Sequence, residues 1–303
     1  MISPFRYLAI AALAALGVLG SVPASVAQTA TPVLRSWMSP DIGDAWTQGY
    51  KGQRTTITVV DDFSSGNRFT GNLGTGSLLY RHGEWTRLEV SMIAPLATIR
   101  SQSFYSGTTV NLAAGLNVLN LSYGMYAKGT YSLNQLGWSA QESSIINYAR
   151  NGRAVVVKAA GNDGIAIGST NAAGNKDFFN LALVGTQSAI YVGALTTNGT
   201  VSNPASLASY SNRAGTNTAV QSHFLVVGVD SSKTGLAGTS FAAPIISGYA
   251  SILGSKFTSA TPTQITNQLL NTARKDTLLN YNAATYGMGE ASLSRALAPL
   301  TIR

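Results

Sequence analysis

One serine in the sequence stands where its hydroxyl could attack a bound group. Ser240 lies in residues 238–244 (GTSFAAP), directly before an apolar run at helical spacing, and Pro244 fits only the first turn of a helix. The pattern therefore predicts Ser240 at a helix N-terminus, where backbone N–H groups and the helix dipole stabilise an anion. The alternative is a serine that only caps a buried helix.

An aspartate and a histidine are the candidates for proton transfer. The β-branched run at residues 56–60 predicts a buried strand that ends at Asp61, and ligands bind beyond the carboxyl ends of parallel strands. His82 opens a predicted helix that ends before Pro95, and it is one of only two histidines. The other, His223, is predicted at a strand edge. A turn aspartate and a surface histidine are the alternatives for Asp61 and His82.

Two of these segments resemble a known family. Residues 238–244 match the Gly-Thr-Ser-x-Ala-Ala-Pro nucleophile segment of the subtilisin-like serine proteases (subtilases) at every fixed position. Residues 81–86 (RHGEWT) resemble the start of that family's histidine helix, although Glu84 and Trp85 replace the usual threonine and second histidine. The resemblance implies a triad of Ser240 as nucleophile, His82 as base and Asp61 as orienting acid. The chain is identified as a divergent, bacterial-type member with an altered histidine segment.

Two strand ends resemble the family's substrate site. A predicted strand at residues 154–160 runs into Asn162, and it resembles the oxyanion-hole segment, in which the Asn162 amide acts beside the Ser240 backbone N–H. The alternative is a turn asparagine. A second strand exit resembles the segment that pairs with the substrate backbone. The resemblance assigns substrate binding to Leu121, Ser122, Tyr123, Gly124, Ala159, Ala160 and Gly161. Lys158, inside the apolar strand, has no partner evident in the sequence.

Two other functions stay open. A sedolisin-like acid protease shares the serine loop but uses a glutamate base, which Glu84 or Glu89 would supply. His82 beside a glycine, with Asp61 at a strand end, favours the histidine mechanism instead. The other alternative is a catalytically silent binding protein on the same fold. It is suggested by the altered histidine segment and by a leader much shorter than the folding propeptide of subtilases.

Composition fits one folded domain. The 303 residues are 45% hydrophobic and 11% charged, and the resemblance over residues 36–298 implies a three-layer α/β/α subtilisin-like fold with a mostly parallel, doubly wound sheet in a domain at 36–303. The formal charge is +8, but the basic residues are scattered, so no nucleic-acid partner is expected. The absence of cysteine excludes disulfides and thiolate chemistry. Calcium is possible by resemblance, but the sequence assigns no metal site.

The N-terminus predicts export. Arg6, the apolar residues 8–22 and the small residues 25–27 are typical of a secretory signal peptide at 1–27, followed by a short leader at 28–35. A retained membrane anchor is the alternative, although the apolar stretch is shorter than the roughly 20 residues that span a bilayer. We expect a secreted or periplasmic monomer that acts on peptides or proteins, with no membrane segment after cleavage.

Overall fold

A seven-stranded sheet forms the centre of the fold in the computed structural model, which describes residues 31–302. The strand order is β11-β10-β9-β7-β5-β1-β4, and every neighbouring pair is parallel. The expected mostly parallel sheet is confirmed. Its strands are β1 (Thr55–Asp61), β4 (Thr98–Ser103), β5 (Leu116–Leu121), β7 (Val155–Ala159), β9 (Ala189–Leu195), β10 (Phe224–Gly228) and β11 (Gly289–Glu290).

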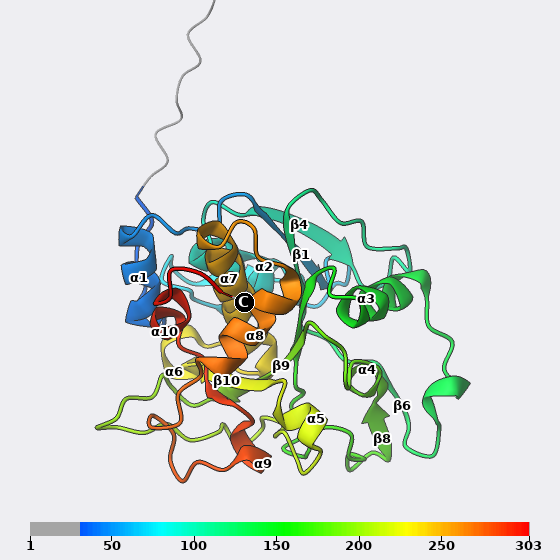
Figure 1. Cartoon of the computed structure of the whole chain (residues 1–303). Coiled ribbons are helices and arrows are strands. Elements are labelled where there is room, and N and C mark those ends of the chain that lie inside the picture. Colours follow the sequence, from blue (N-terminus) through cyan, green and yellow to red (C-terminus); the bar gives the residue numbers. More distant parts are fainter. Residues whose placement is uncertain (1–30, 303) are drawn as a thin grey trace, which may run out of the picture. The chain divides into compact units, whose positions relative to one another are not determined.

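Helices cover both faces of the sheet (Figure 1), which confirms the doubly wound, three-layer architecture. The strands β1, β7, β9 and β10 are buried along their whole length, as expected for β-branched runs between two helical layers. One face packs against α1 (Pro40–Thr47), α2 (His82–Ile93), α7 (Ala242–Lys256), α8 (Pro262–Asn271) and α10 (Leu293–Leu297). The other packs against α3 (Ala140–Arg150), α4 (Phe178–Ala182), α5 (Thr218–Gln221) and α9 (Ala283–Tyr286).

The predicted central helix is α7, whose residues 242–255 are all buried. It begins two residues after Ser240, which lies in a short 3₁₀ turn, η2 (Thr239–Phe241), so Pro244 falls in the first helical turn as expected. A side chain at Gly248 would place Cβ 2.4 Å from Ile93 Cγ2. The close packing of α7 on α2 therefore requires a glycine at this position.

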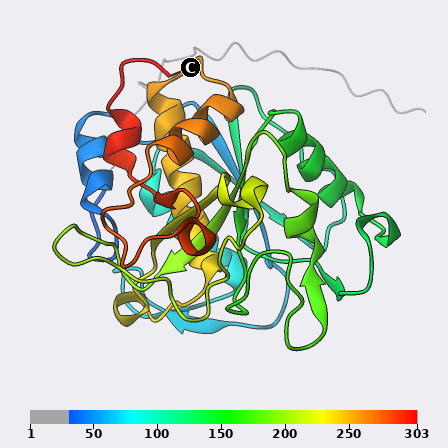
Figure 2. The same ribbon diagram turned by 60° about the horizontal axis from the view of Figure 1, so that its bottom comes forward.

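The first and last helices of the described unit lie side by side (Figure 1, Figure 2). The Asp41 carboxylate on α1 accepts a hydrogen bond of 3.0 Å from the backbone N–H of Ser294 on α10. This contact joins α1 to α10.

Residues 64–79 are rich in glycine, serine, threonine and asparagine, a composition that predicts a loop, but they are not irregular throughout. The segment contains β2 (Phe69–Gly71) and most of β3 (Leu78–Tyr80), which pair as an antiparallel ribbon. Each strand has only three residues, too few for an alternating pattern to stand out among the surrounding polar residues. A second ribbon, β6 (Tyr126–Lys128) with β8 (Asn175–Asp177), joins segments far apart in the chain. The remaining short elements are η1 (Leu133–Gln135) and α6 (Ser231–Thr234).

The predicted signal peptide at 1–27 lies outside the described residues, as does the start of the predicted leader. Across residues 31–302, the helices are all too short or too polar to span a bilayer.

Candidate active site

Asp61 and His82 meet at the carboxyl edge of the sheet, where the strand order reverses around β1. Asp61 is the last residue of β1 and is fully buried, and His82 is the first residue of α2. The Asp61 Oδ1 atom lies 2.6 Å from His82 Nδ1. Asp61 also accepts hydrogen bonds from the Thr86 hydroxyl at 2.9 Å and from the Asp62 N–H at 2.6 Å. These contacts fix the carboxylate so that it orients the imidazole.

Two aromatic rings flank the His82 imidazole. The ring of Phe69, on β2, lies 6.2 Å from the imidazole, and the ring of Phe241, next to Ser240, lies 5.8 Å from it, measured between ring centroids. Burial by itself lowers the pKa of His82, but the hydrogen bond and charge of Asp61 and the charge of Asp62 outweigh it. The pKa of His82 is therefore raised above its ordinary value.

We expect an Asp62→Asn variant to keep its activity to lower pH than the wild type. The family resemblance implies that His82 is a base, which works only when neutral, so we expect activity to fall as the pH drops through the pKa of His82. Removing the Asp62 charge lowers that pKa. The asparagine oxygen can still accept the backbone hydrogen bonds from Ser64 and Ser65. The acidic limb of kcat/KM against pH measures the effect.

Glu84→Gln is the matched control for that experiment. The Glu84 carboxylate is engaged with Arg81, at 3.0 Å from its guanidinium and 2.8 Å from its backbone nitrogen, and its charge is not among the causes of the His82 shift. The acidic limb of kcat/KM against pH for Glu84→Gln should coincide with that of the wild type. An equal midpoint for Asp62→Asn would refute the role of the Asp62 charge.

Ser240 lies at the surface of a narrow pocket, and 9% of it is exposed. Its hydroxyl donates to the Ser122 carbonyl at 3.1 Å, and the Ser122 hydroxyl donates back to the Ser240 carbonyl at 2.8 Å. These two bonds join turn η2 to the end of β5.

Asn162 follows β7 and is oriented by the residue before Ser240. Its Oδ1 atom accepts hydrogen bonds from the Thr239 N–H at 2.8 Å and from the Thr239 hydroxyl at 3.0 Å. In residues 31–302 no hydrogen bond occupies the Asn162 Nδ2 group, which lies close to Gly238. Gly238 has a φ of 131°, which only glycine adopts readily. The amide is thus held with its donor end free.

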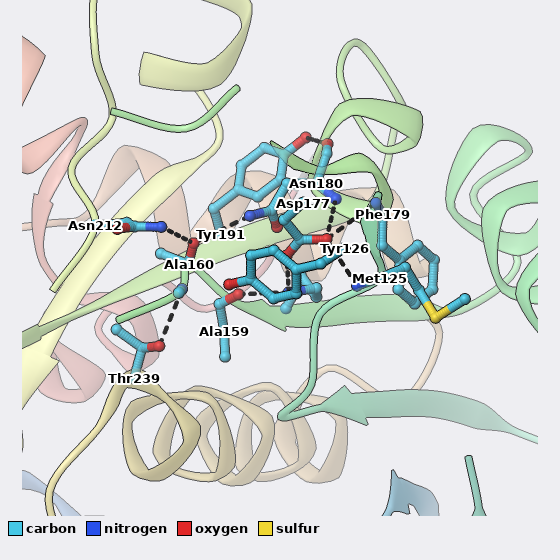
Figure 3. Close-up of polar contacts among 12 residues, drawn as sticks. Met125, Tyr126, Ala159, Ala160, Asp177, Phe179, Asn180, Tyr191, Asn212 and Thr239 are labelled. Atoms are coloured by element: carbon cyan, nitrogen blue, oxygen red, sulfur yellow. Dashed lines mark hydrogen bonds and ion pairs between the residues drawn. The ribbon is translucent and has the colours of Figure 1, made fainter. Parts of the chain in front are cut away.

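A pocket of about 200 Å³ opens beside Ser240 and Asn162. Five of the seven residues assigned to substrate binding line it: Ser122, Tyr123, Gly124, Ala159 and Gly161. The other two, Leu121 and Ala160, do not, because their side chains are fully buried in the core. The Ala160 carbonyl accepts hydrogen bonds from Asn180 and Asn212 (Figure 3). A binding role for all seven stays a prediction.

Lys158 has a partner that sequence reasoning missed. Its Nζ atom lies 3.0 Å from Asp177 Oδ2 and donates to the Ala159 carbonyl at 2.7 Å, with both charged side chains buried. Asp177 caps α4 and also accepts the Met125 N–H (Figure 3). The position of Asp177 directly before a helix was the only sequence signal that could have identified it.

The two glutamates of the acid-protease alternative do not contact the Asp61–His82 pair through hydrogen bonds. Glu84 is engaged with Arg81, as described. Glu89 is 3% exposed, and one of its carboxyl oxygens has no partner among residues 31–302. Burial raises the pKa of Glu89 well above its ordinary value, because it penalises the charged form of the carboxyl group.

A Glu89→Met variant should be more stable than the wild type at neutral pH, by about 1–3 kcal/mol, the usual cost of an unsatisfied buried polar group. The unfolded chain ionises Glu89 above its ordinary pKa of 4.5, whereas burial raises the pKa of this group in the folded chain, so the wild type loses stability as the pH rises past 4.5. Denaturant unfolding at pH 4 and pH 8 measures the gain, which should be larger at pH 8. A gain that does not change with pH would contradict a raised pKa of Glu89 in the folded chain.

Residues 31–302 contain no cluster of three or more acidic or histidine side chains placed to hold a metal ion. The expectation that calcium is possible stays untested.

The sequence matches the model of a known family. The model described as "Subtilase family" (Peptidase_S8) matches residues 88–289, two thirds of the chain. The chain belongs to the subtilase family. The matched range contains Asn162 and Ser240, whereas Asp61 and His82 precede it. Subtilases are serine peptidases, so peptides and proteins are the substrate class.

Solved structures similar to this subtilase share its fold at low identity. The prenylagaramide maturation protease PagA has a TM-score of 0.54 and 19% identity, over 86% of this chain and 98% of that one. MycP1 of the ESX-1 type VII secretion system has a TM-score of 0.54 and 18% identity, over 89% and 88%. A Pseudoalteromonas arctica protease has a TM-score of 0.52 and 19% identity, over 85% and 93%. No functionally curated protein matches this subtilase in sequence.

Proposed function

We propose that this subtilase is a serine endopeptidase that works through Asp61, His82 and Ser240. The observation that carries the proposal is the 2.6 Å contact between the buried Asp61 carboxylate and His82 Nδ1. That contact leaves the other imidazole nitrogen available on α2, which packs against turn η2 with Ser240. A buried acid that orients an imidazole is one half of the arrangement of triad hydrolases. Among residues 31–302, His82 forms no hydrogen bond to Ser240, whose hydroxyl donates to the Ser122 carbonyl instead.

The reaction begins when the Ser240 hydroxyl leaves the Ser122 carbonyl and turns to the imidazole. His82 Nε2 takes the hydroxyl proton while Ser240 Oγ forms a bond to the peptide carbonyl carbon. The negative oxygen receives hydrogen bonds from Asn162 Nδ2 and the Ser240 N–H. The C–N bond then breaks, and His82 gives its proton to the leaving amine.

Water completes the cycle. His82 takes a proton from the water as its oxygen attacks the acyl-enzyme carbonyl, and the proton returns to Ser240 when the ester bond breaks. The exit of β5 at residues 122–124 lies along the pocket and offers backbone groups to an extended substrate. The family resemblance assigns substrate binding to this segment, and Ala159 and Gly161 line the same pocket.

We also propose that the chain is exported and that its signal peptide is removed after Ala27, which makes the mature enzyme secreted or periplasmic. The N-terminal sequence of the mature protein from a fractionated culture tests this. A start at Gln28 is expected, and an intact residue 1 in the membrane fraction would contradict it.

The test of the proposed activity is cleavage of an unfolded protein. Fragments from internal cuts should appear, and a serine-directed sulfonyl fluoride should prevent them. A thiol-directed reagent should have no effect, because the chain contains no cysteine. The silent-scaffold alternative predicts binding of the unfolded protein without fragments, and this outcome would overturn the proposal.

A further inference from the structure

The pocket beside Ser240 contains three charged residues, and they define what it can bind. Lys158, Asp163 and Asp177 are the charged groups of its lining, one cation against two carboxylates. The inference below rests on the proposed function, in which the side chain next to the attacked carbonyl enters this pocket.

Lys158 and Asp177 neutralise each other. Asp177 Oδ1 accepts backbone N–H groups from Met125 at 3.0 Å, Phe179 at 3.0 Å and Asn180 at 3.4 Å, and Oδ2 lies 3.0 Å from Lys158 Nζ (Figure 3). Three N–H donors satisfy one oxygen of the Asp177 carboxylate, and the Lys158 ammonium satisfies the other. The pair therefore adds no net charge to the pocket.

The Asp177 carboxylate nevertheless faces the exit of β5, the segment at residues 122–124. A Cβ atom at Gly124 would lie 2.8 Å from Asp177 Oδ2 and 2.6 Å from the Tyr126 ring. The missing side chain at Gly124 thus lets the carboxylate and the phenol ring approach the backbone that a substrate would pair with. A bound side chain meets an acceptor there.

Asp163 supplies the net charge. It is exposed, its Oδ2 atom accepts the Tyr126 hydroxyl at 3.2 Å, and its Oδ1 atom accepts the Asn171 amide at 3.3 Å. Within residues 31–302 no cation pairs with it. Burial and the charges of Asp177 and Asp163 raise the pKa of Tyr126, which agrees with a hydroxyl placed near both carboxylates.

We propose that this pocket selects a lysine or arginine side chain at the residue whose carbonyl Ser240 attacks, with Asp163 as the main specificity residue. The pocket volume of about 200 Å³ accommodates a long side chain, and Asp163 and Asp177 provide two carboxylates in its lining. An acidic side chain would be repelled by Asp163 and Asp177, and Lys158, the one cation in the pocket lining, is already paired with Asp177.

Peptide binding to a Ser240→Ala variant tests the inference without catalysis. Four acetylated tetrapeptide amides that differ only in the last residue, lysine, arginine, norleucine or glutamate, are titrated by calorimetry. Lysine and arginine should bind about tenfold more tightly than norleucine, and glutamate most weakly. Equal or tighter binding of norleucine, tightest binding of glutamate, or no binding of any peptide would overturn the inference.

Asp163→Asn in the same background identifies the residue responsible. It is isosteric and exposed, so the fold should persist, and it should remove most of the preference for a cation. Asp44→Asn, on the exposed side of α1, is the matched control and should keep the preference. An unchanged preference in Asp163→Asn would refute the role of this residue.

The two proposals can fail separately. Tight binding of the lysine peptide with no cleavage by the wild type would support the pocket and refute the endopeptidase. Cleavage by the wild type without a preference for lysine or arginine would support the endopeptidase and refute the proposed selectivity of the pocket.

Discussion

Replacing His82 by alanine is expected to lower kcat for peptide hydrolysis by about 10⁶-fold with little change in KM. His82 contacts Asp61 through Nδ1, and under the proposed mechanism its loss removes the proton acceptor for Ser240 and the donor for the leaving amine. Ser240→Ala should cost about as much, and the double variant no more than either single one, because the residues act as a unit. Steady-state kinetics on one peptide substrate, with variants of verified fold, measure these losses.

His223→Ala is the control for the loss of a histidine. His223 directly precedes β10, and its imidazole Nδ1 lies 2.8 Å from the Ala189 carbonyl oxygen. It has no part in the proposed mechanism. This variant should keep its activity. If His82→Ala instead kept one tenth of the wild-type kcat, the base would lie elsewhere and the glutamate mechanism would have to be reconsidered.

Replacing Asn162 by aspartate is expected to lower kcat by about 10²–10³-fold, the usual cost of one oxyanion donor. The substitution keeps the oxygen that accepts from the Thr239 N–H and hydroxyl, but it replaces the Nδ2 donor by a carboxylate oxygen. The loss should therefore appear in kcat, because a donor to the oxyanion acts only once negative charge develops. The ratio of kcat to KM effects separates this role from ground-state binding.

Thr239→Val is the companion variant. It removes the hydroxyl that donates to Asn162 and accepts the Gly161 N–H at 3.0 Å, but it leaves the Nδ2 donor in place. A smaller loss than in Asn162→Asp is expected. A full rate in Asn162→Asp would mean that other groups stabilise the oxyanion.

The sequence predicts best where local chemistry and burial agree. These residues are stable only when buried: the apolar runs that form β1, β7 and β10, and the small residues of α7. Their elements could therefore be assigned from the sequence pattern alone. The placement of Asp61 at a strand end followed from β1, and that of His82 at a helix start followed from the helical stretch that ends before Pro95.

Contacts between distant segments could not be predicted in the same way. The partner of Lys158 lies 19 residues further on, across the β6–β8 ribbon, and nothing in the spacing selects Asp177 over other aspartates. The engagement of Glu84 with Arg81 depends on side-chain rotamers, which the sequence leaves open. The burial of Leu121 and Ala160 depends on which way each side chain points as its strand ends, and a family resemblance to the whole segment does not resolve that.

Covalent labelling tests the central claim most directly. The wild type is treated with a fluorophosphonate at neutral pH, digested, and analysed by mass spectrometry. We predict one phosphonylated residue, Ser240, with labelling greatly slowed in His82→Ala and unchanged in His223→Ala. An unlabelled Ser240 in the folded wild type, or labelling as fast without His82 as with it, would contradict a serine activated by that imidazole.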